Sequence, residues 1–343
     1  MFAKAIARTR TSLYLNSIHP DMFKEDISRE RSKWLFKKYV HDVELENHSY
    51  CNRVCWFCPN AFLDRRSQSV FMTRAIFEKI ISNLAEIDYS EQLEWSGYAE
   101  HFAEPSFLPR VAEARKVLPK ARMIVFSNGD YLDKEMMRYV LSLGVKIHVD
   151  IYPPEGEEFN EVKIADAIRK FRKRTGYAVL PKSQDERGWG DYLIADAAGS
   201  VVSSLKVGKY NKENIFTRGG AMDIPKRATY QRTSACTKPV YHMNVNYDGK
   251  GMLCCHTRTD FEGHKDAVIS NLADPAQDMF SFFAKLAPAR RGLLGPGRKC
   301  GACATCDDGD DLPGGPMART TIGSTPFTII RRLQDRMSNQ RSA

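Results

Sequence analysis

The segment Cys51-Asn52-Arg53-Val54-Cys55-Trp56-Phe57-Cys58 places three cysteines in one short loop. The C-x3-C-x2-C spacing suits a 4Fe–4S cluster, which normally takes four thiolates. Three thiolates leave one iron without a protein ligand, and that open position can hold a substrate or a cofactor. A structural zinc site pairs C-x2-C with a second ligand pair, whereas the nearby His48 lies beyond Tyr50. The loop therefore favours iron–sulfur over zinc.

The composition is that of an ordinary folded protein. A chain of 343 residues can bury a large core or divide in two. No apolar run approaches the roughly 18 residues that span a bilayer, so no membrane partner is expected. The first twenty residues lack a long apolar stretch, which favours a basic N-terminal arm over a secretory signal or an organelle presequence. Nine cysteines without a secretory signal predict the reducing cytoplasm.

The net charge is +9, which favours anionic partners in general. One local cluster, Arg169-Lys170-Phe171-Arg172-Lys173-Arg174, falls at the end of a predicted helix. Cations at that end interact favourably with the helix dipole and with water. A solvated helix end is therefore favoured over a nucleic-acid patch.

Hydrophobic periodicity predicts strands alternating with helices. This alternation implies a parallel sheet covered by helices, but it does not separate an open sheet from a barrel. Regularity fades after about residue 182. The predicted strands are 40–46, 92–95, 122–126, 145–151 and 201–207; the helices are 21–38, 73–87, 107–118, 134–143, 158–174 and 276–286; the polar loops are 182–190 and 307–311.

The cysteine spacing, with Phe57 directly before the last cysteine, resembles the signature of the radical S-adenosylmethionine (SAM) enzymes. The resemblance implies a partial (β/α)6 TIM-like barrel whose site lies at the C-terminal ends of the strands. It implies that Cys51, Cys55 and Cys58 hold a 4Fe–4S cluster with SAM at the open iron. In this family a reductant such as flavodoxin or ferredoxin supplies an electron. SAM is then cleaved to methionine and a 5′-deoxyadenosyl radical, which takes a hydrogen atom from the substrate.

Two strand ends resemble the family's SAM-binding segments, and a third carries Asp150 where the family often has Ser. Gly97-Tyr98-Ala99-Glu100 matches a Gly-x-Gly-Glu-Pro stretch, with Ala99 and His101 as departures, and we favour Glu100 over Glu104 as the contact to the methionine amino group. Ser127-Asn128-Gly129 resembles Thr-Asn-Gly. Plain turns and an ordinary strand-end acid explain these segments equally well. The predicted cofactor-binding residues are Phe57, Gly97, Tyr98, Ala99, Glu100, Ser127, Asn128 and Asp150.

Six more cysteines lie in the last third of the chain. Cys236, Gly249 and Cys254 form a C-x12-G-x4-C pattern that resembles the opening of SPASM and twitch domains, and Asp248-Gly249 predicts a β-hairpin turn. Six thiolates cannot fill two four-thiolate sites, so one auxiliary 4Fe–4S cluster is favoured over two, with zinc as the structural alternative. The predicted ligands are Cys236, Cys254, Cys300, Cys303 and Cys306, and the spare Cys255 is a candidate hydrogen-atom donor.

These patterns predict four parts. Residues 1–38 form an N-terminal helical extension, 39–217 the partial barrel, 218–310 a SPASM/twitch-like auxiliary domain, and 311–343 a C-terminal tail.

The resemblance implies a radical SAM oxidoreductase or epimerase acting on a sugar, aminocyclitol or nucleotide. An auxiliary cluster that accepts an electron gives dehydrogenation, and a cysteine that returns a hydrogen atom gives epimerisation. A second hypothesis is a maturase of ribosomally made peptides, although fifty residues before Cys51 leave little room for a leader-binding domain. A third is a non-enzymatic, metal-stabilised scaffold that binds nucleic acid. Reductive SAM cleavage separates the first two from the third.

Overall fold

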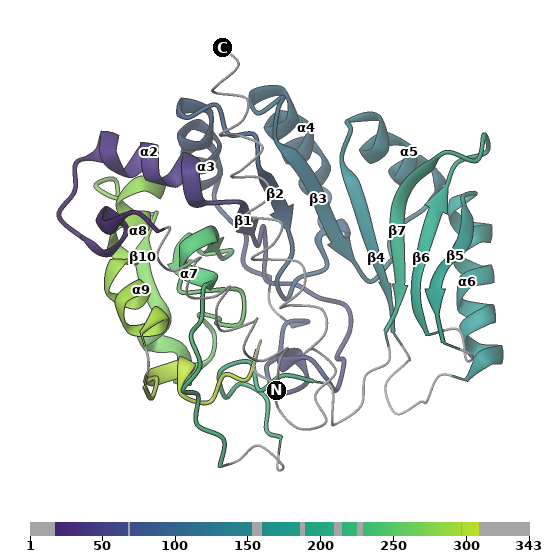
Figure 1. The fold of residues 1–343 in the computed structure, drawn as a ribbon. Helices are drawn as coiled ribbons and strands as arrows, with labels where there is room; N and C mark the ends of the chain where they lie inside the picture. The colour runs from purple at the N-terminus through teal and green to yellow at the C-terminus, as the bar shows by residue number, and fades with distance from the viewer. Residues whose placement is uncertain are drawn as a thin grey trace, which may run out of the picture.

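The computed structural model describes residues 18–67, 69–152, 160–185, 189–208, 215–224, 229–295 and 297–308. Their strands form one sheet in the order β10-β9-β8-β1-β2-β3-β4-β7-β6-β5 (Figure 1). The strands are β1 (Asp42–Leu45), β2 (Gln92–Trp95), β3 (Arg122–Ser127), β4 (Lys146–Ile151), β5 (Ala178–Gln184), β6 (Gly190–Ala195), β7 (Val201–Val207), β8 (His242–Val245), β9 (Lys250–Met252) and β10 (Val268–Asn271).

Helices follow the strands as the periodicity predicted. Figure 1 shows α6 beside the β5 end of the sheet and α8 and α9 at the β10 end. Side chains of Thr73, Asp133 and Asn160 cap α3, α5 and α6 by accepting backbone N–H bonds. The helices are α2 (Arg29–Tyr39), α3 (Arg74–Glu86), α4 (Phe107–Val117), α5 (Lys134–Ser142), α6 (Glu161–Thr175), α7 (Lys238–Tyr241), α8 (Met279–Lys285) and α9 (Ala287–Leu294).

Six neighbouring strands, β8, β1, β2, β3, β4 and β7, run parallel. Antiparallel strands flank them, with β9 and β10 at one edge and β6 and β5 at the other. The predicted α/β fold is confirmed. Strands β8 to β10, from the cysteine-rich region, continue the same sheet through the β8–β1 pairing. The predicted domain boundaries stay predictions.

The two faces of the parallel strands differ in polarity because successive side chains point to opposite faces. One face is apolar, buried and in the same core as the helices. The other face carries polar groups, among them Glu44, Glu94 and His148. The apolar face is made by Val43, Leu45, Leu93, Trp95, Met123, Val125, Ile147, Val149, Leu205, Val207, Met243 and Val245.

Two predictions of local structure were wrong, and one helix was missed. The predicted loop 182–190 contains the end of β5 and the start of β6; β5 is an exposed edge strand, so apolar alternation does not mark it. The predicted helix 21–38 is a 3-10 turn, Pro20–Phe23, followed by α2, because Ser28 caps a new helix by accepting from Arg31 N. Helix α9 was not predicted; it begins directly after α8, with Pro288 in its first turn.

The predicted hairpin is confirmed: β8 and β9 flank the Asp248-Gly249 turn. Gly249 has φ +80°, and a Cβ there would lie 2.6 Å from Cδ1 of Ile76. Among the helices of the described residues, none combines the length and apolarity needed to cross a membrane.

We predict that Gly249→Ala destabilises the protein by about 2–4 kcal/mol, through left-handed strain plus overpacking. Gly199→Ala is the matched control, because Gly199 has φ +82° with nothing within 4 Å of the added Cβ. It should lose only about 1–2 kcal/mol. Urea unfolding measures both. In an Ile76→Val background the Gly249→Ala penalty should shrink, and an unchanged penalty would contradict the proposed clash.

Candidate functional site

The first cysteine loop follows β1 and lies against the C-terminal ends of β2, β3 and β4. Cys51, Cys55 and Cys58 line one cavity there. The same cavity is lined by all eight predicted cofactor-binding residues: Phe57, Gly97, Tyr98, Ala99, Glu100, Ser127, Asn128 and Asp150. Segments that are far apart in the sequence thus meet at one site.

The three thiols of this loop form a buried donor set. Burial raises the pKa of Cys51 and of Cys55 to about 12, and neighbouring thiols of the loop add to both shifts. Burial also raises the pKa of Cys58. A bound metal would supply the positive charge that deprotonates such thiols. Three convergent thiols beside an open cavity fit an iron–sulfur cluster with one free iron position.

Glu100 joins the ends of β2 and β3. Its carboxylate accepts hydrogen bonds from Ser127 Oγ (2.8 Å), Asn128 N (2.7 Å) and Phe102 N (3.3 Å). Burial raises its pKa to about 7, although these bonds oppose the shift. Glu104, the alternative contact, is less buried and does not line this cavity; it accepts from Ser106 N at 3.1 Å.

The loop is tied to the end of β3 by polar side chains. Arg53 Nε donates to Asp130 Oδ2 at 2.7 Å, and Asn52 Nδ2 donates to the same oxygen at 2.8 Å. Asn128 Nδ2 donates to Asn52 Oδ1 at 2.9 Å. Residues between the cysteines therefore orient the loop over the strand ends.

A buried ionic network lies behind Tyr98. Glu46 accepts from Arg65 Nη1 and from Tyr98 N (3.0 Å), and Arg65 Nε also donates to Asp260 at 2.9 Å. Arg258 pairs with Asp260 and lies 4.5 Å from the centroid of the Tyr98 ring. The network connects the strand-end loop 97–100 to the chain that follows β9.

Four cysteines line a second, smaller cavity: Cys236, Cys254, Cys303 and Cys306. Burial raises the pKa of Cys303 to about 12 and that of Cys306 to about 11. Cys300 is exposed and does not contribute to this lining. All nine cysteines are free of disulfides. Four thiols around one cavity, that of Cys254 buried and the others partly buried, fit either a cluster or zinc.

The predicted solvated loop 307–311 is wrong for its first two residues; residues 309–311 lie outside the described part. Asp307 is 2% exposed and accepts from Thr217 N at 2.9 Å. Asp308 pairs with His256 Nε2 at 3.0 Å. Asp307 and Asp308 are thus held by the segments around Thr217 and His256.

Arg218 was missed by the sequence analysis. It has φ +50°, which is unusual for a residue with a side chain. Its Nη1 lies 2.8 Å from His256 Nδ1, and its guanidinium carbon lies 6.0 Å from the centroid of the Tyr98 ring. The guanidinium therefore lies between one residue of the second cavity and one of the first. The Gly-Gly pair that follows marked a turn, but nothing in the sequence showed where this side chain would lie.

Cys255, the predicted hydrogen-atom donor, lies outside both cavity linings. Lys238 Nζ is 3.7 Å from its Sγ, and Glu44 and His242 are close by. Burial opposes ionisation of this thiol, but Lys238 lowers its pKa overall. The role of Cys255 as a donor stays a prediction.

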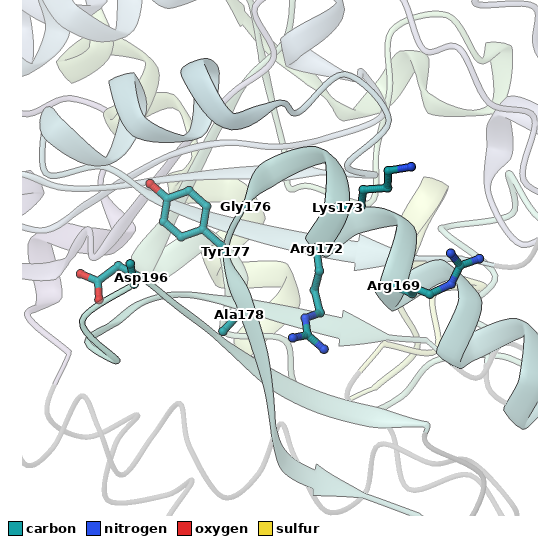
Figure 2. A pocket seen from close by; sticks show the side chains of 8 residues that line it. Arg169, Arg172, Lys173, Gly176, Tyr177, Ala178 and Asp196 are labelled. Atoms are coloured by element: carbon teal, nitrogen blue, oxygen red, sulfur yellow. The ribbon is translucent and has the colours of Figure 1, made fainter.

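The basic cluster at the end of α6 borders a separate surface pocket (Figure 2). Arg169, Arg172 and Lys173 line it together with Tyr177 and Asp196. Arg169 also pairs with Asp166 one helical turn away. The arrangement is that of cations at a helix C-terminus, as the sequence predicted.

No protein-family model matches the chain. It is 28% identical, over 130 residues, to the S-adenosyl-L-methionine-dependent 2-deoxy-scyllo-inosamine dehydrogenase of Niallia circulans. This match covers 38% of the chain and 47% of that relative, so it spans about half of the relative's length.

Two solved structures of one protein are similar to the chain, and the first shares its fold. The crystal structure of BtrN with AdoMet and 2-DOIA covers 75% of this chain and 88% of its own, with TM-score 0.52 and 21% identity. BtrN in an open conformation covers 75% and 86%, with TM-score 0.47 and 18% identity. The chain is therefore similar in fold to the BtrN structure with AdoMet and 2-DOIA, as the sequence resemblance implied.

We predict that Glu46→Gln costs about 2–4 kcal/mol of unfolding free energy, because it removes a buried charge that balances Arg65. Asp88→Asn is the control: it breaks the exposed pair between Asp88 and Lys120 and should have no measurable effect. Urea denaturation of the metal-free proteins checks both. Equal effects for the two variants would contradict the prediction that the buried charge of Arg65 must be balanced by Glu46.

Glu100 predicts a pH dependence. Its pKa is about 7 in the folded protein against 4.5 for a free side chain. The folded state holds this proton more tightly, so the group's contribution to stability is full below about pH 4.5 and is lost as pH rises to about 7. As pH rises from about 5 to about 7.5, the unfolding free energy of Glu100→Gln should increase relative to that of the wild type, by at most about 3 kcal/mol. Urea unfolding without ligand measures both proteins, and a difference that stays constant over this pH range would refute the prediction.

Proposed function

We propose that this protein is a radical SAM dehydrogenase of a small substrate rich in hydroxyl or amino groups, of the aminocyclitol type. One observation carries the proposal: three convergent thiols and four convergent thiols line separate cavities with Tyr98 between the two regions. Tyr98 lines the first cavity, and its hydroxyl lies 3.4 Å from the carbonyl oxygens of Cys255 and His256. These two residues directly follow Cys254, one of the cysteines of the second cavity.

Cys51, Cys55 and Cys58 are the proposed ligands of the first cluster, and Glu100 faces the space for SAM. Cys236, Cys254, Cys303 and Cys306 are the proposed ligands of one auxiliary cluster, because these four already fill a four-thiolate site. When bound, the first cluster with SAM supplies a hydrogen-abstracting radical and the second supplies a one-electron acceptor. Cys300 is therefore assigned no ligand role.

The chain's own residues then bind and orient the substrate. Asp150 and Tyr152 line the cavity at the end of β4, and the guanidinium of Arg218 lies 6.0 Å from the ring of Tyr98, which also lines it. Such groups offer charged and neutral hydrogen-bond partners to hydroxyl and amino groups. The name of the Niallia circulans relative, an inosamine dehydrogenase, supports this substrate class.

An apolar cluster keeps water from the cysteine loop. Phe57 packs with Ile215, Met222 and Ile224, against Cys55, Cys58 and Tyr152. Excluding water protects a reactive radical from side reactions. Ile215, Met222 and Ile224 come from the same segment as Arg218, so this segment contributes both the apolar cover and the cation.

Dehydrogenation is favoured over epimerisation. A hydrogen-atom donor must carry S–H, whereas the ammonium of Lys238 beside Cys255 favours the thiolate. The short connection through Tyr98 instead supports removal of an electron toward the second region. The proposal includes a one-electron reductant such as flavodoxin or ferredoxin, and a cytoplasmic setting.

We predict about eight irons per chain in the anaerobically reconstituted protein, and about four in Cys254→Ala. Cys55→Ala should lower 5′-deoxyadenosine formation from SAM to the level of an enzyme-free control. Cys254→Ala should keep SAM cleavage but lose formation of oxidised substrate. Cys300→Ser is the matched control, and it should keep both the wild-type iron content and the wild-type activity.

Iron analysis and chromatography of the nucleoside measure these outcomes. Wild-type protein that forms no 5′-deoxyadenosine above the Cys55→Ala level would overturn the radical SAM proposal. Loss of four irons in Cys300→Ser would overturn the ligand assignment of the second cavity. Substrate recovered with inverted stereochemistry and no oxidation would replace dehydrogenation by epimerisation.

A further inference from the structure

We infer that Glu44, His242 and Cys255 form a third metal site, for one divalent ion of the zinc type, separate from both cysteine cavities. One ligand atom from each residue lies within 4.8 Å of the other two. Glu44 is 2% exposed and His242 is 4% exposed. This inference does not depend on the proposed function.

The fold brings the three residues together from separate elements. His242 is the first residue of β8 and lies opposite Asp42 of β1. Glu44 is two residues further along β1, so its side chain is on the same sheet face as that of His242. Cys255 follows β9 and returns to this face after the hairpin. Pairing of β1 with β8 fixes two ligands, and the hairpin supplies the third.

His242 gives the independent indication of a ligand. Its Nε2 is buried and makes no well-directed hydrogen bond within the described part of the chain. Yet Glu44 Oε2 lies 3.1 Å away, and the Cys255 sulfur is close enough to interact with the same ring. A single N–H can be directed at one acceptor only. An imidazole nitrogen, a carboxylate oxygen and a thiol sulfur within 4.8 Å of one another are a donor set that a shared ion explains.

The donor types select the ion. One thiolate, one imidazole and one carboxylate suit zinc, with bonds of about 2.3 Å to sulfur and about 2.0–2.2 Å to nitrogen and oxygen. Ligand atoms on a tetrahedral zinc are then roughly 3.3–3.8 Å apart. The 3.1 Å between His242 Nε2 and Glu44 Oε2 lies just below that range, and all three ligand atoms are within 4.8 Å of one another. Three protein ligands leave a fourth position for water or the second carboxylate oxygen.

Lys238 is compatible with the ion and defines the competing explanation. Its ammonium, 3.7 Å from Cys255 Sγ, can donate to a metal-bound thiolate from the outer shell. Without an ion, Lys238 and a protonated His242 would balance Glu44 and a Cys255 thiolate as a metal-free charge network. The same residues fit both arrangements, so the metal content of the protein is what distinguishes them.

The test uses the full chain, purified without air, with its iron–sulfur clusters reconstituted and zinc supplied in the growth medium. We expect about one zinc per chain. X-ray absorption at the zinc edge should show one sulfur at about 2.3 Å and two or three nitrogen or oxygen atoms at about 2.0–2.2 Å. Cys255→Ser and His242→Asn should each lower zinc content at least tenfold while iron stays unchanged. Cys300→Ser should keep zinc and iron at wild-type levels.

Two results would overturn the inference. If wild-type protein with its full iron content holds less than a tenth of a zinc per chain, the three residues form the metal-free charge network. A shell of four sulfurs means that zinc occupies the second cysteine cavity instead. The wild-type spectrum decides even where a variant fails to fold. SAM cleavage, measured on the same sample, reports the proposed function separately.

Discussion

Alternation of side chains along the parallel strands is the constraint on which the rest of the structure depends. On β8, β1, β2 and β4 every second residue is apolar and buried in the core shared with the helices, and on β3 and β7 most of these positions are. The remaining positions on these strands are therefore free to be polar. Glu44, Glu94 and His148 occupy such positions although they lie inside the protein. A one-residue slip in register would exchange the two faces and remove both core and site.

The ionic network around Tyr98 is the second organising feature. Glu46 belongs to the chain after β1, while Arg258 and Asp260 belong to the chain after β9. Their contacts fix loop 97–100 relative to the second cysteine region, over a sequence separation that no local propensity could bridge. Buried ion pairs contribute little net stability but define one arrangement of charged groups. Here that arrangement determines how the two thiol sets face each other.

The residues that the sequence analysis assigned to the first site line one cavity, because the information that groups them is local. The loop from Cys51 to Cys58 carries its ligands within eight residues, and each cofactor-binding segment follows a strand with clear periodicity. The hairpin at Gly249 was predictable for the same reason. The helix boundary at Ser28 was not, because a polar cap inside an amphipathic stretch does not interrupt its periodicity.

Long-range features were beyond sequence reasoning. Cys300 fits the C-x2-C-x2-C spacing as well as its neighbours do, and only folding leaves it exposed. Arg218, Glu44 and His242 belong to no motif. Their positions follow from strand pairing and from the backbone at residues 215–224, which depend on contacts across the whole sheet. Asp307 was misassigned because acidic runs are usually solvated, whereas Thr217 buries this one.

The four-cysteine cavity has a consequence for the stability of the protein in the cell. Its thiols come from residues 236 to 306, so a metal held there acts as a covalent cross-link between the sheet edge and the last described turn. Cross-links that close long loops restrict the unfolded chain most. Oxidative loss of that metal would therefore loosen the C-terminal third before the barrel, exposing it to proteases. Air sensitivity and turnover in the cell would then share one cause.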